Sequence, residues 1–444
     1  MRVDDVVETG RLVGFGLRGA TGVVRDIHGA ISQSAFTTVR QVAGPLAVPV
    51  VTPVEIAHDT MTRGIYGLTG TAMEVGATAA GVVVSKLPAQ VVEEPEIPGA
   101  PARPAPTHLA DHRRARAIMA IVHGFHGDKL AAAGSSVSYP MTLRRSGRDV
   151  PVITSGLAAA YPDAKETLVV FVHGFVGNEQ IWKRRSDRDD HGRALSYGRR
   201  LEADGEVSAL WVRYNTGLRV STNGRQLRDL MRKVKARWPV PVRRIVFVGH
   251  SMGGLVAHSA LAQSDLDEPW TEVTTDAVTL GTPHHGTPLE RTANTIATVS
   301  ADYPATRWLA GIIRYRSDGI RDMRHGNLVE EDWRDHDPED PEDRRTHARP
   351  HDQVRHLAVV ATVSRDPHSR WADYFGDLVV PRDSARGWEH AEDGAVGSSR
   401  TVHLGGLNHL DLQNHPRVHS LIADVVGVVS PDSEDPRGSE LSGR

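Results

Sequence analysis

The stretch RRIVFVGHSMGGLVAHSALA, residues 243–262, joins an apolar run to a helix-like run through a serine flanked by glycines. The apolar run Ile245–Val248 has the length of a buried strand, and the residues after Met252 have the pattern of an amphipathic helix. Because glycines stand two positions before and after Ser251, a strand and a helix can approach each other closely around it. The spacing predicts a strained strand-to-helix turn that exposes the Ser251 hydroxyl at a helix N-terminus, beside the free amide of Met252.

The composition bounds the class of protein. At 444 residues the chain is long enough for one big domain with appendages, or for two domains. A formal net charge of −3, from 52 basic and 55 acidic side chains, provides no global field that would attract nucleic acid. The lack of cysteine in the sequence excludes disulfides, thiolate nucleophiles and cysteine-based metal sites, and it agrees with a reducing cytoplasm.

The first hundred residues differ in composition from the rest. Residues 1–92 are rich in Gly and Ala, and their apolar spacing predicts a helical extension. This extension packs on the main domain or is partly disordered or, alternatively, makes a peripheral membrane contact. Neither a basic signal sequence nor an apolar run of spanning length is visible, so the expected location is cytoplasmic, or peripheral at the membrane. Residues 93–108 are rich in proline and predict a linker, residues 109–430 the main domain, and residues 431–444 a disordered tail.

Within the main domain, strand-like and helix-like runs alternate, which favours a parallel sheet covered by helices on both faces. The predicted strands are 167–172, 207–214, 244–249, 276–280, 356–363 and 401–404, and the predicted helices are 223–238 and 252–264. An insertion is predicted at about 284–355, with a helix at 305–315 that caps a pocket and a solvated charged loop at 330–350. The apolar residues of this cap would contact an acyl chain or pack in the core: Trp308, Leu309, Ile312 and Ile313.

Further strings accompany the turn Gly249-His250-Ser251-Met252-Gly253. They are RYNTGLRVSTNGRQL (213–227), LGTPHHGTPLE (280–290), GDLVVPRDSA (376–385) and GLNHLDLQNHPRV (406–418). With them the chain resembles, over roughly residues 115–428, the alpha/beta-hydrolase superfamily in its lipase and esterase branch, and especially bacterial lipase-like proteins related to GPI inositol-deacylase. The resemblance implies the alpha/beta-hydrolase fold, with a mostly parallel sheet, helices on both faces and a cap insertion.

A serine hydroxyl becomes a useful nucleophile when a base takes its proton, and an imidazole that titrates near neutrality suits this role. In this fold the nucleophile, the acid and the histidine follow one another in that order along the chain. His409 enters a loop directly after the last predicted strand, and it matches the family's catalytic histidine. Four other histidines have different expected roles: His403 packed in the strand, His415 capping a helix, and His390 and His419 solvated.

The acid that orients the imidazole is expected after the predicted strand 356–363. Asp377 lies in a string that resembles the family's acid loop, where the carboxylate follows Gly and precedes an apolar pair and Pro. Asp366 stands closer to the strand and is the alternative, and Asp373 and Asp383 are further candidates in the segment. Each of these aspartates could instead cap the backbone of its own turn.

The tripeptide His-Gly-Phe occurs twice, and its second copy is His173-Gly174-Phe175. This copy follows the strand-like run 167–172, upstream of the nucleophile, where the first oxyanion-hole loop of such a hydrolase lies. The resemblance implies that the amide of Phe175 joins the amide of Met252 in the oxyanion hole. It also implies that His173 braces the turn.

The first copy of the tripeptide sits in a run that reads equally well as a helix, so His123 and His126 are expected to be structural. The adjacent His284 and His285 invite comparison with a metal site. Neighbouring side chains after a strand point apart, however, and no third ligand stands at a familiar spacing. The sequence therefore predicts no metal and no cofactor.

Together these residues predict a serine hydrolase that cleaves carboxylic esters, lipase-like or esterase-like, through a Ser251, His409 and Asp377 triad and an acyl-enzyme. The residues expected to shape the site are His173, Gly174, Gly249, His250 and Gly253. The expected substrate is a small-molecule or lipid ester, and no nucleic acid is expected to bind. Two alternatives stay open: an acyltransferase with the same triad, and a non-catalytic binding or scaffold protein of the same fold.

Overall fold

A computed structural model describes residues 113–135, 138–184, 186, 195–265, 267–287, 317–335, 353–365, 377, 379–386 and 399–428. The predicted N-terminal extension, the linker, the cap helix at 305–315 and the C-terminal tail lie outside these residues. The chain divides into two units, and the second of them contains the described residues between 117 and 131, 139 and 287, and 317 and 428. The second unit contains the whole sheet and all the candidate site residues.

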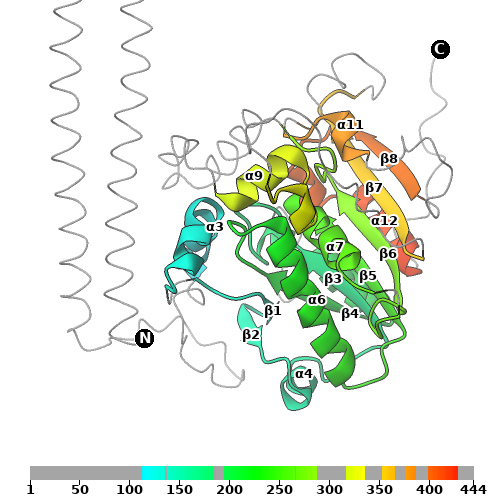
Figure 1. Cartoon of the computed structure of the whole chain (residues 1–444). Helices are drawn as coiled ribbons and strands as arrows, with labels where there is room; N and C mark the ends of the chain where they lie inside the picture. The colour runs from blue at the N-terminus through cyan, green and yellow to red at the C-terminus, as the bar shows by residue number, and fades with distance from the viewer. Residues whose placement is uncertain are drawn as a thin grey trace, which may run out of the picture. The chain divides into compact units, whose positions relative to one another are not determined.

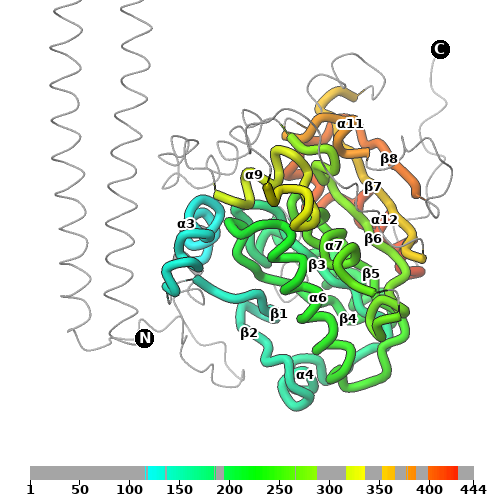
Figure 2. Tube along the Cα trace, viewed as in Figure 1, coloured from blue at the N-terminus to red at the C-terminus, as the bar shows by residue number. Residues whose placement is uncertain are grey.

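Eight strands form one sheet in the order β2-β1-β4-β3-β5-β6-β7-β8. Their bounds are β1 Thr142–Arg145, β2 Arg148–Val150, β3 Thr167–Val172, β4 Val207–Arg213, β5 Arg244–His250, β6 Thr274–Leu280, β7 Arg355–Thr362 and β8 Ser399–Gly405. Strands β3 to β8 run parallel, and β1 is antiparallel to both of its neighbours. The β1–β2 hairpin and β8 lie at opposite edges of the sheet (Figures 1 and 2).

The six predicted strands agree with β3 to β8 to within two residues at each end. Strands β3 to β7 are mostly apolar because helices cover both faces of the sheet, as the burial of all but the first residue of β3 illustrates. The β1–β2 hairpin was not predicted, since its short strands are rich in charged residues. Its Arg144 is fully buried and pairs with Asp149 at 2.5 Å and with Glu179 at 3.4 Å.

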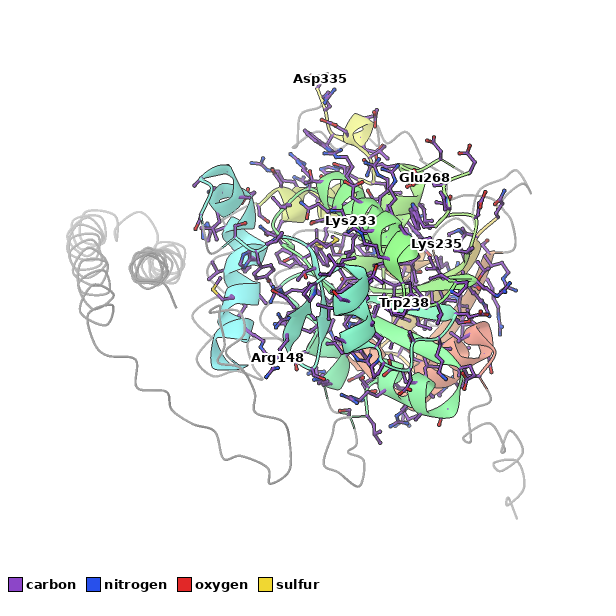
Figure 3. The ribbon with its side chains drawn as sticks, turned by 90° about the horizontal axis from the view of Figure 1, so that it is seen from below. Arg148, Lys233, Lys235, Trp238, Glu268 and Asp335 are labelled. Carbon is purple, nitrogen blue, oxygen red and sulfur yellow. The ribbon has the colours of Figure 1, made fainter. Side chains whose placement is uncertain are left out.

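Helices cover the two faces of the sheet, which confirms the predicted alpha/beta fold class (Figure 1). Helices α6 (Val220–Arg237) and α7 (Met252–Ala262) lie on one face and correspond to the two predicted helices. Helices α5 (Tyr197–Asp204) and α12 (Pro416–Val426) lie on the other, where their apolar side chains share one core with alternate residues of the strands. The remaining α-helices among the described residues are α3 (Arg113–Ala132), α4 (Thr154–Ala160), α9 (Asp318–His325) and α11 (Arg382–Ala385). The outer side of α6 carries charged residues such as Lys233 (Figure 3).

The predicted solvated loop at 330–350 is wrong at its start, where residues 330–332 form a short 3-10 helix. Asp332 is buried, and its carboxylate accepts hydrogen bonds from the amides of Leu328 at 2.7 Å and Val329 at 3.1 Å. Trp333 donates from its ring nitrogen to the Ser221 hydroxyl at 3.1 Å. The sequence did not predict this capping role, because Asp332 stands in a run of charged residues and cannot be told apart there from its solvated neighbours.

No helix in the described ranges combines the length and the apolar character needed to cross a bilayer.

Candidate active site

Ser251 occupies a strained turn between strand and helix. Strand β5 ends at His250 and α7 begins at Met252, so Ser251 alone connects the two elements. Its φ of 53° and ψ of −126° lie in a region that few residues other than glycine adopt. The amide of Ser251 donates to the Leu280 carbonyl at 2.8 Å, and the Thr282 hydroxyl donates to the Ser251 carbonyl at 3.0 Å. These bonds hold the serine at a rigid corner.

Close approach of the backbones explains the two glycines around this corner. A Cβ on Gly249 would lie 2.5 Å from the Cα of Gly254, in the first turn of α7. A Cβ on Gly253 would lie 2.1 Å from the carbonyl oxygen of Val172, at the end of β3. Both separations are too short for any side chain, so these positions require glycine.

The structure brings His409 and Asp377 together. The Nδ1 of His409 lies 2.7 Å from Oδ2 of Asp377, and both side chains are at most 2% exposed. Because a carboxylate oxygen beside the ring can only accept, Nδ1 carries a proton, and in the neutral ring the lone pair is on Nε2. This Nε2 is buried and has no hydrogen-bond partner among the described residues. An imidazole in this state can accept a proton from a hydroxyl.

Backbone amides hold the Asp377 carboxylate from the other side. Its Oδ1 accepts from the amides of Val379 at 2.9 Å and Val380 at 2.8 Å. The backbone joins the pair as well, since the amide of His409 donates to the Asp377 carbonyl at 3.1 Å. Of the other candidate acids, Asp383 has a side chain that is 76% exposed, and Asp366 and Asp373 lie outside the described residues.

His250 connects the Ser251 turn to the loop of His409. Its Nε2 lies 3.0 Å from the carbonyl oxygen of His409, and the two rings are 4.7 Å apart. Burial lowers the pKa of His250 well below its usual value, and the neighbouring His409 lowers it further. His250 is therefore neutral and donates from Nε2.

The turn after β3 lies directly against Ser251. A Cβ on Gly174 would be 3.0 Å from the Cβ of Ser251 and 2.9 Å from Nδ1 of His250. Within the described part of the chain, neither the Phe175 amide nor the Met252 amide donates a hydrogen bond, and Met252 begins a helix whose first amides have no intrahelical partner. Two unpaired amides beside a serine suit a developing oxyanion.

His173 binds the same turn from the inside. Its Nδ1 donates to the Gly174 carbonyl at 2.9 Å, and its Nε2 accepts from the Tyr214 amide at 3.4 Å. The Tyr214 hydroxyl donates to the His173 carbonyl at 2.7 Å, and the two rings stack at 4.4 Å. Burial lowers the pKa of His173 to about 4, so the ring stays neutral near pH 7.

The first His-Gly-Phe copy lies within α3, in agreement with its interpretation as a helix. In this copy, Nδ1 of His123 lies 2.7 Å from the carbonyl oxygen of Met119, one helical turn earlier. Its Phe125 packs edge-on against Phe175 of the second copy, with ring centroids 5.7 Å apart. The first copy thus supports the second through packing.

The other histidines near the end of the chain differ in their surroundings. His403 lies in β8, where it is half-buried, and His415 caps α12 by accepting from the Arg417 amide at 3.2 Å, as predicted. The expectation that His419 is solvated is wrong, because it is 2% exposed and its ring lies 6.1 Å from that of Tyr197. His419 and its neighbour Val418 both lie on the buried side of α12, and the polarity of the histidine had suggested the exposed side. His390 lies outside the described residues.

Of the two adjacent histidines, His284 faces the core and His285 is exposed. The ring of His284 stacks on that of His258 at 5.1 Å, and Nε2 of His284 lies 3.2 Å from the Thr279 hydroxyl. His258 in turn contacts His356, with 3.2 Å between the facing ring nitrogens. Across the described ranges, no group of three or more His, Cys, Asp or Glu side chains is arranged to hold a metal ion.

Sequence reasoning missed the polar residues that support the site. Thr282 binds the Ser251 carbonyl, and Tyr214 binds the His173 carbonyl. Ser384 connects two loops, since its hydroxyl accepts from the His285 amide at 3.1 Å. The sequence held a signal for Thr282 and Tyr214. Both stand just after parallel strands, and the carboxyl ends of these strands lie on the same side of the sheet as Ser251.

Residues 163–306 match the model of a family described as the PGAP1-like alpha/beta domain. The matched range contains Phe175 and Ser251 and ends before Asp377 and His409. The match confirms the predicted resemblance to lipase-like proteins of the alpha/beta-hydrolase class. No curated protein matches the chain.

Several solved structures are similar to the chain. The lipase BlEst2 of Bacillus licheniformis in its mature form is 19% identical, with a TM-score of 0.38, over 59% of this chain and 91% of that chain. The esterase RhEst1 from Rhodococcus sp. ECU1013 is 15% identical, with a TM-score of 0.35, over 60% of this chain and 93% of that chain. The Pyrococcus furiosus esterase Pf2001 is 14% identical, with a TM-score of 0.35, over 60% and 83%.

Proposed function

We propose that this chain is a serine hydrolase that cleaves carboxylic esters through an acyl-enzyme. The observation that carries the proposal is the buried pair of Asp377 and His409 at 2.7 Å, which leaves Nε2 of His409 without a partner among the described residues. The loop of His409 is hydrogen-bonded to His250, the residue before Ser251. The backbone of Ser251 is strained, as in a nucleophile turn. The PGAP1-like family match over residues 163–306 supports the same class of protein.

In the proposed reaction, Oγ of Ser251 attacks the acyl carbon while Nε2 of His409 takes the hydroxyl proton. Asp377 holds the imidazole in the required tautomer and stabilises its charged form. The amides of Phe175 and Met252 bind the oxyanion of the tetrahedral intermediate, and each such donor is worth on the order of 3 kcal/mol of barrier.

The intermediate then collapses. The bond to the leaving alcohol breaks, and His409 gives its proton to that oxygen. Water attacks the Ser251 ester in the same manner, with its proton passing to His409 and then back to Ser251 as the carboxylic acid leaves. The proposed substrate is a small-molecule or lipid ester, and the resemblance to lipase-like proteins favours lipid-like acyl groups.

Labelling by a fluorophosphonate tests the nucleophile. The purified full chain should be labelled at Ser251, as mapped by peptide mass spectrometry, and Ser251→Ala should abolish both the label and the hydrolysis of nitrophenyl esters. A series of acyl chain lengths then identifies the preferred acyl group, and added acceptor alcohols separate hydrolysis from acyl transfer. A folded wild-type protein that stays unlabelled, while a control hydrolase reacts, would favour the non-catalytic alternative.

A further inference from the structure

The turn after β3 contains a second strained residue. Among the described residues other than glycine, positive φ occurs at Ser146, Val176, Ser251 and Asp335, and Val176 is the β-branched one. Its φ is 50°, in a region that β-branched side chains rarely adopt. Val176 directly follows Phe175, whose amide is a candidate oxyanion donor. Strain of this kind persists only where the surroundings enforce it.

The geometry of the turn shows why Val176 is strained. The amide of Gly177 donates to the Gly174 carbonyl at 3.1 Å, which closes a four-residue turn. Val176 stands at the third position, where a positive φ normally calls for Gly or Asn. Its side chain is packed against α3, since a Cβ on Gly124 would lie 2.5 Å from Cγ1 of Val176. An interaction outside the turn is needed to offset the cost of this conformation.

Thr216 supplies that interaction. The amide of Val176 donates to the Thr216 hydroxyl at 3.3 Å. Thr216 is 1% exposed, so bulk water does not compete for this bond. Two residues earlier, Tyr214 binds the carbonyl of His173 at 2.7 Å. The segment after β4 therefore holds the turn at its start and at its centre.

We propose that Thr216 is a positioning residue for the oxyanion hole. Its hydroxyl holds the peptide unit of Val176 in the strained orientation and thereby directs the amide of Phe175 toward the reacting carbonyl at Ser251. That Thr216 holds the turn follows from the structure alone, whereas its effect on catalysis rests on the proposed function. An oxyanion forms only in the transition state, so a displaced donor lowers kcat and leaves KM nearly unchanged.

Two substitutions at Thr216 separate its hydroxyl from its shape. Thr216→Val keeps the volume and removes the acceptor, and we expect kcat to fall about tenfold with KM within about twofold, less than the loss of a whole oxyanion donor. Thr216→Ser keeps the acceptor and should restore most of kcat. A role in packing alone would give the opposite order, because valine fills the space better than serine.

A second pair of variants tests the connection to backbone strain. Glycine adopts positive φ without cost, so in a Val176→Gly background the turn no longer depends on Thr216. There we expect Thr216→Val to lower kcat less than about threefold relative to Val176→Gly alone. An equal fall in both backgrounds would overturn the inference.

Hydrogen exchange of the peptide that covers residues 173–177 gives a readout that needs no activity. Thr216→Val should speed exchange there, because the amide of Val176 loses its acceptor, whereas Thr216→Ser should not. Unchanged exchange in Thr216→Val, or changed exchange with unchanged kcat, overturns the inference. If Thr216→Val alone unfolds the protein but Thr216→Val combined with Val176→Gly folds, the result supports the inference. If both variants unfold, the inference is overturned. An unlabelled Ser251 in folded wild-type protein refutes the proposed function instead, and exchange still decides whether Thr216 holds the turn.

Discussion

The Nε2 of His250 lies 3.0 Å from the main-chain oxygen of His409, so the residue before the candidate nucleophile holds the loop that carries the candidate base. A carbonyl oxygen can only accept, and Nε2 must therefore carry the proton. The His250 ring lies 4.7 Å from the ring of His409, and it forms a T-shaped contact with Trp182 at 6.4 Å. Since this bond ends on backbone, it positions the imidazole of His409 without taking part in proton transfer.

Replacing His250 tests this link. His250→Phe keeps an aromatic ring but loses the donor, and we expect kcat for a nitrophenyl ester to fall about tenfold while KM changes little. His250→Gln places an amide donor within reach of the same oxygen and should recover part of the loss. Steady-state kinetics, with circular dichroism as the check on folding, measures both, and identical kcat values for the two variants would contradict the link.

Asp377→Asn tests the acid. Both carboxylate oxygens of Asp377 accept, one from His409 and one from the amides of Val379 and Val380. An amide group cannot satisfy all three donors, and it favours the wrong imidazole tautomer, so we expect kcat to fall by about 10³ to 10⁴. Asp383→Asn is the matched control, because that exposed carboxylate lies on the same segment, and its kcat should equal that of wild type. A reversed order would move the acid role to Asp383.

Gly281→Ala tests the space around the pair. Gly281 has a φ of 57°, and a Cβ there would lie 3.0 Å from Oδ2 of Asp377 and 3.0 Å from Nδ1 of His409. The methyl group should push the two apart, and we expect kcat to fall at least tenfold.

Gly427→Ala is the control for the backbone cost alone. Gly427 has a φ of 81°, and a Cβ there would meet nothing within 4 Å. Both variants should lose about 1 kcal/mol of unfolding free energy from strain, measured by urea denaturation. Only Gly281→Ala should lose activity, and equal activity in both variants would show that the pair tolerates the methyl group.

The fold could be predicted wherever burial is uniform. Strands β3 to β7 are largely buried, so their apolar runs stand out against the polar loops. The β1–β2 hairpin has no such contrast, because Arg144 is buried as an ion pair with Glu179, 35 residues further along the chain. Its nearer partner Asp149 is a charged residue that reads in sequence like part of a solvated turn, and a partner as distant as Glu179 leaves no local pattern.

The site divides in the same way. The resemblance of GDLVVPRDSA, residues 376–385, to the family's acid loop predicted Asp377 as the acid, and the structure joins its side chain to that of His409. The hydrogen bonds of Thr216 and His250 could not be predicted in this way, because they depend on which loops meet at the carboxyl ends of the strands. His419 shows the converse error, since its polarity suggested solvent and the helix buries it.

Buried neutral histidines predict that the protein loses stability in acid. Burial lowers the pKa of His173 to about 4, and it lowers the pKa of His250 and of His258 well below the usual value. The unfolded chain binds protons at these sites below about pH 6.5, whereas the folded chain resists them, so stability is full above that pH and falls as the pH drops toward 4. Asp322, whose pKa burial raises to about 6, retains a proton in the folded state and opposes this by at most one proton.

Urea denaturation between pH 7.5 and 5 measures the effect. These three histidines take up about three protons on unfolding and Asp322 releases about one, so together the four groups contribute at most roughly 3 kcal/mol per pH unit to the slope near pH 5. His258→Leu removes one of these groups from α7 without touching the candidate triad, and the slope should fall by about one proton, or roughly 1.4 kcal/mol per pH unit. A stability that stays constant from pH 7.5 to 5, or a slope that His258→Leu leaves unchanged, would mean that the buried rings are not held neutral by the fold.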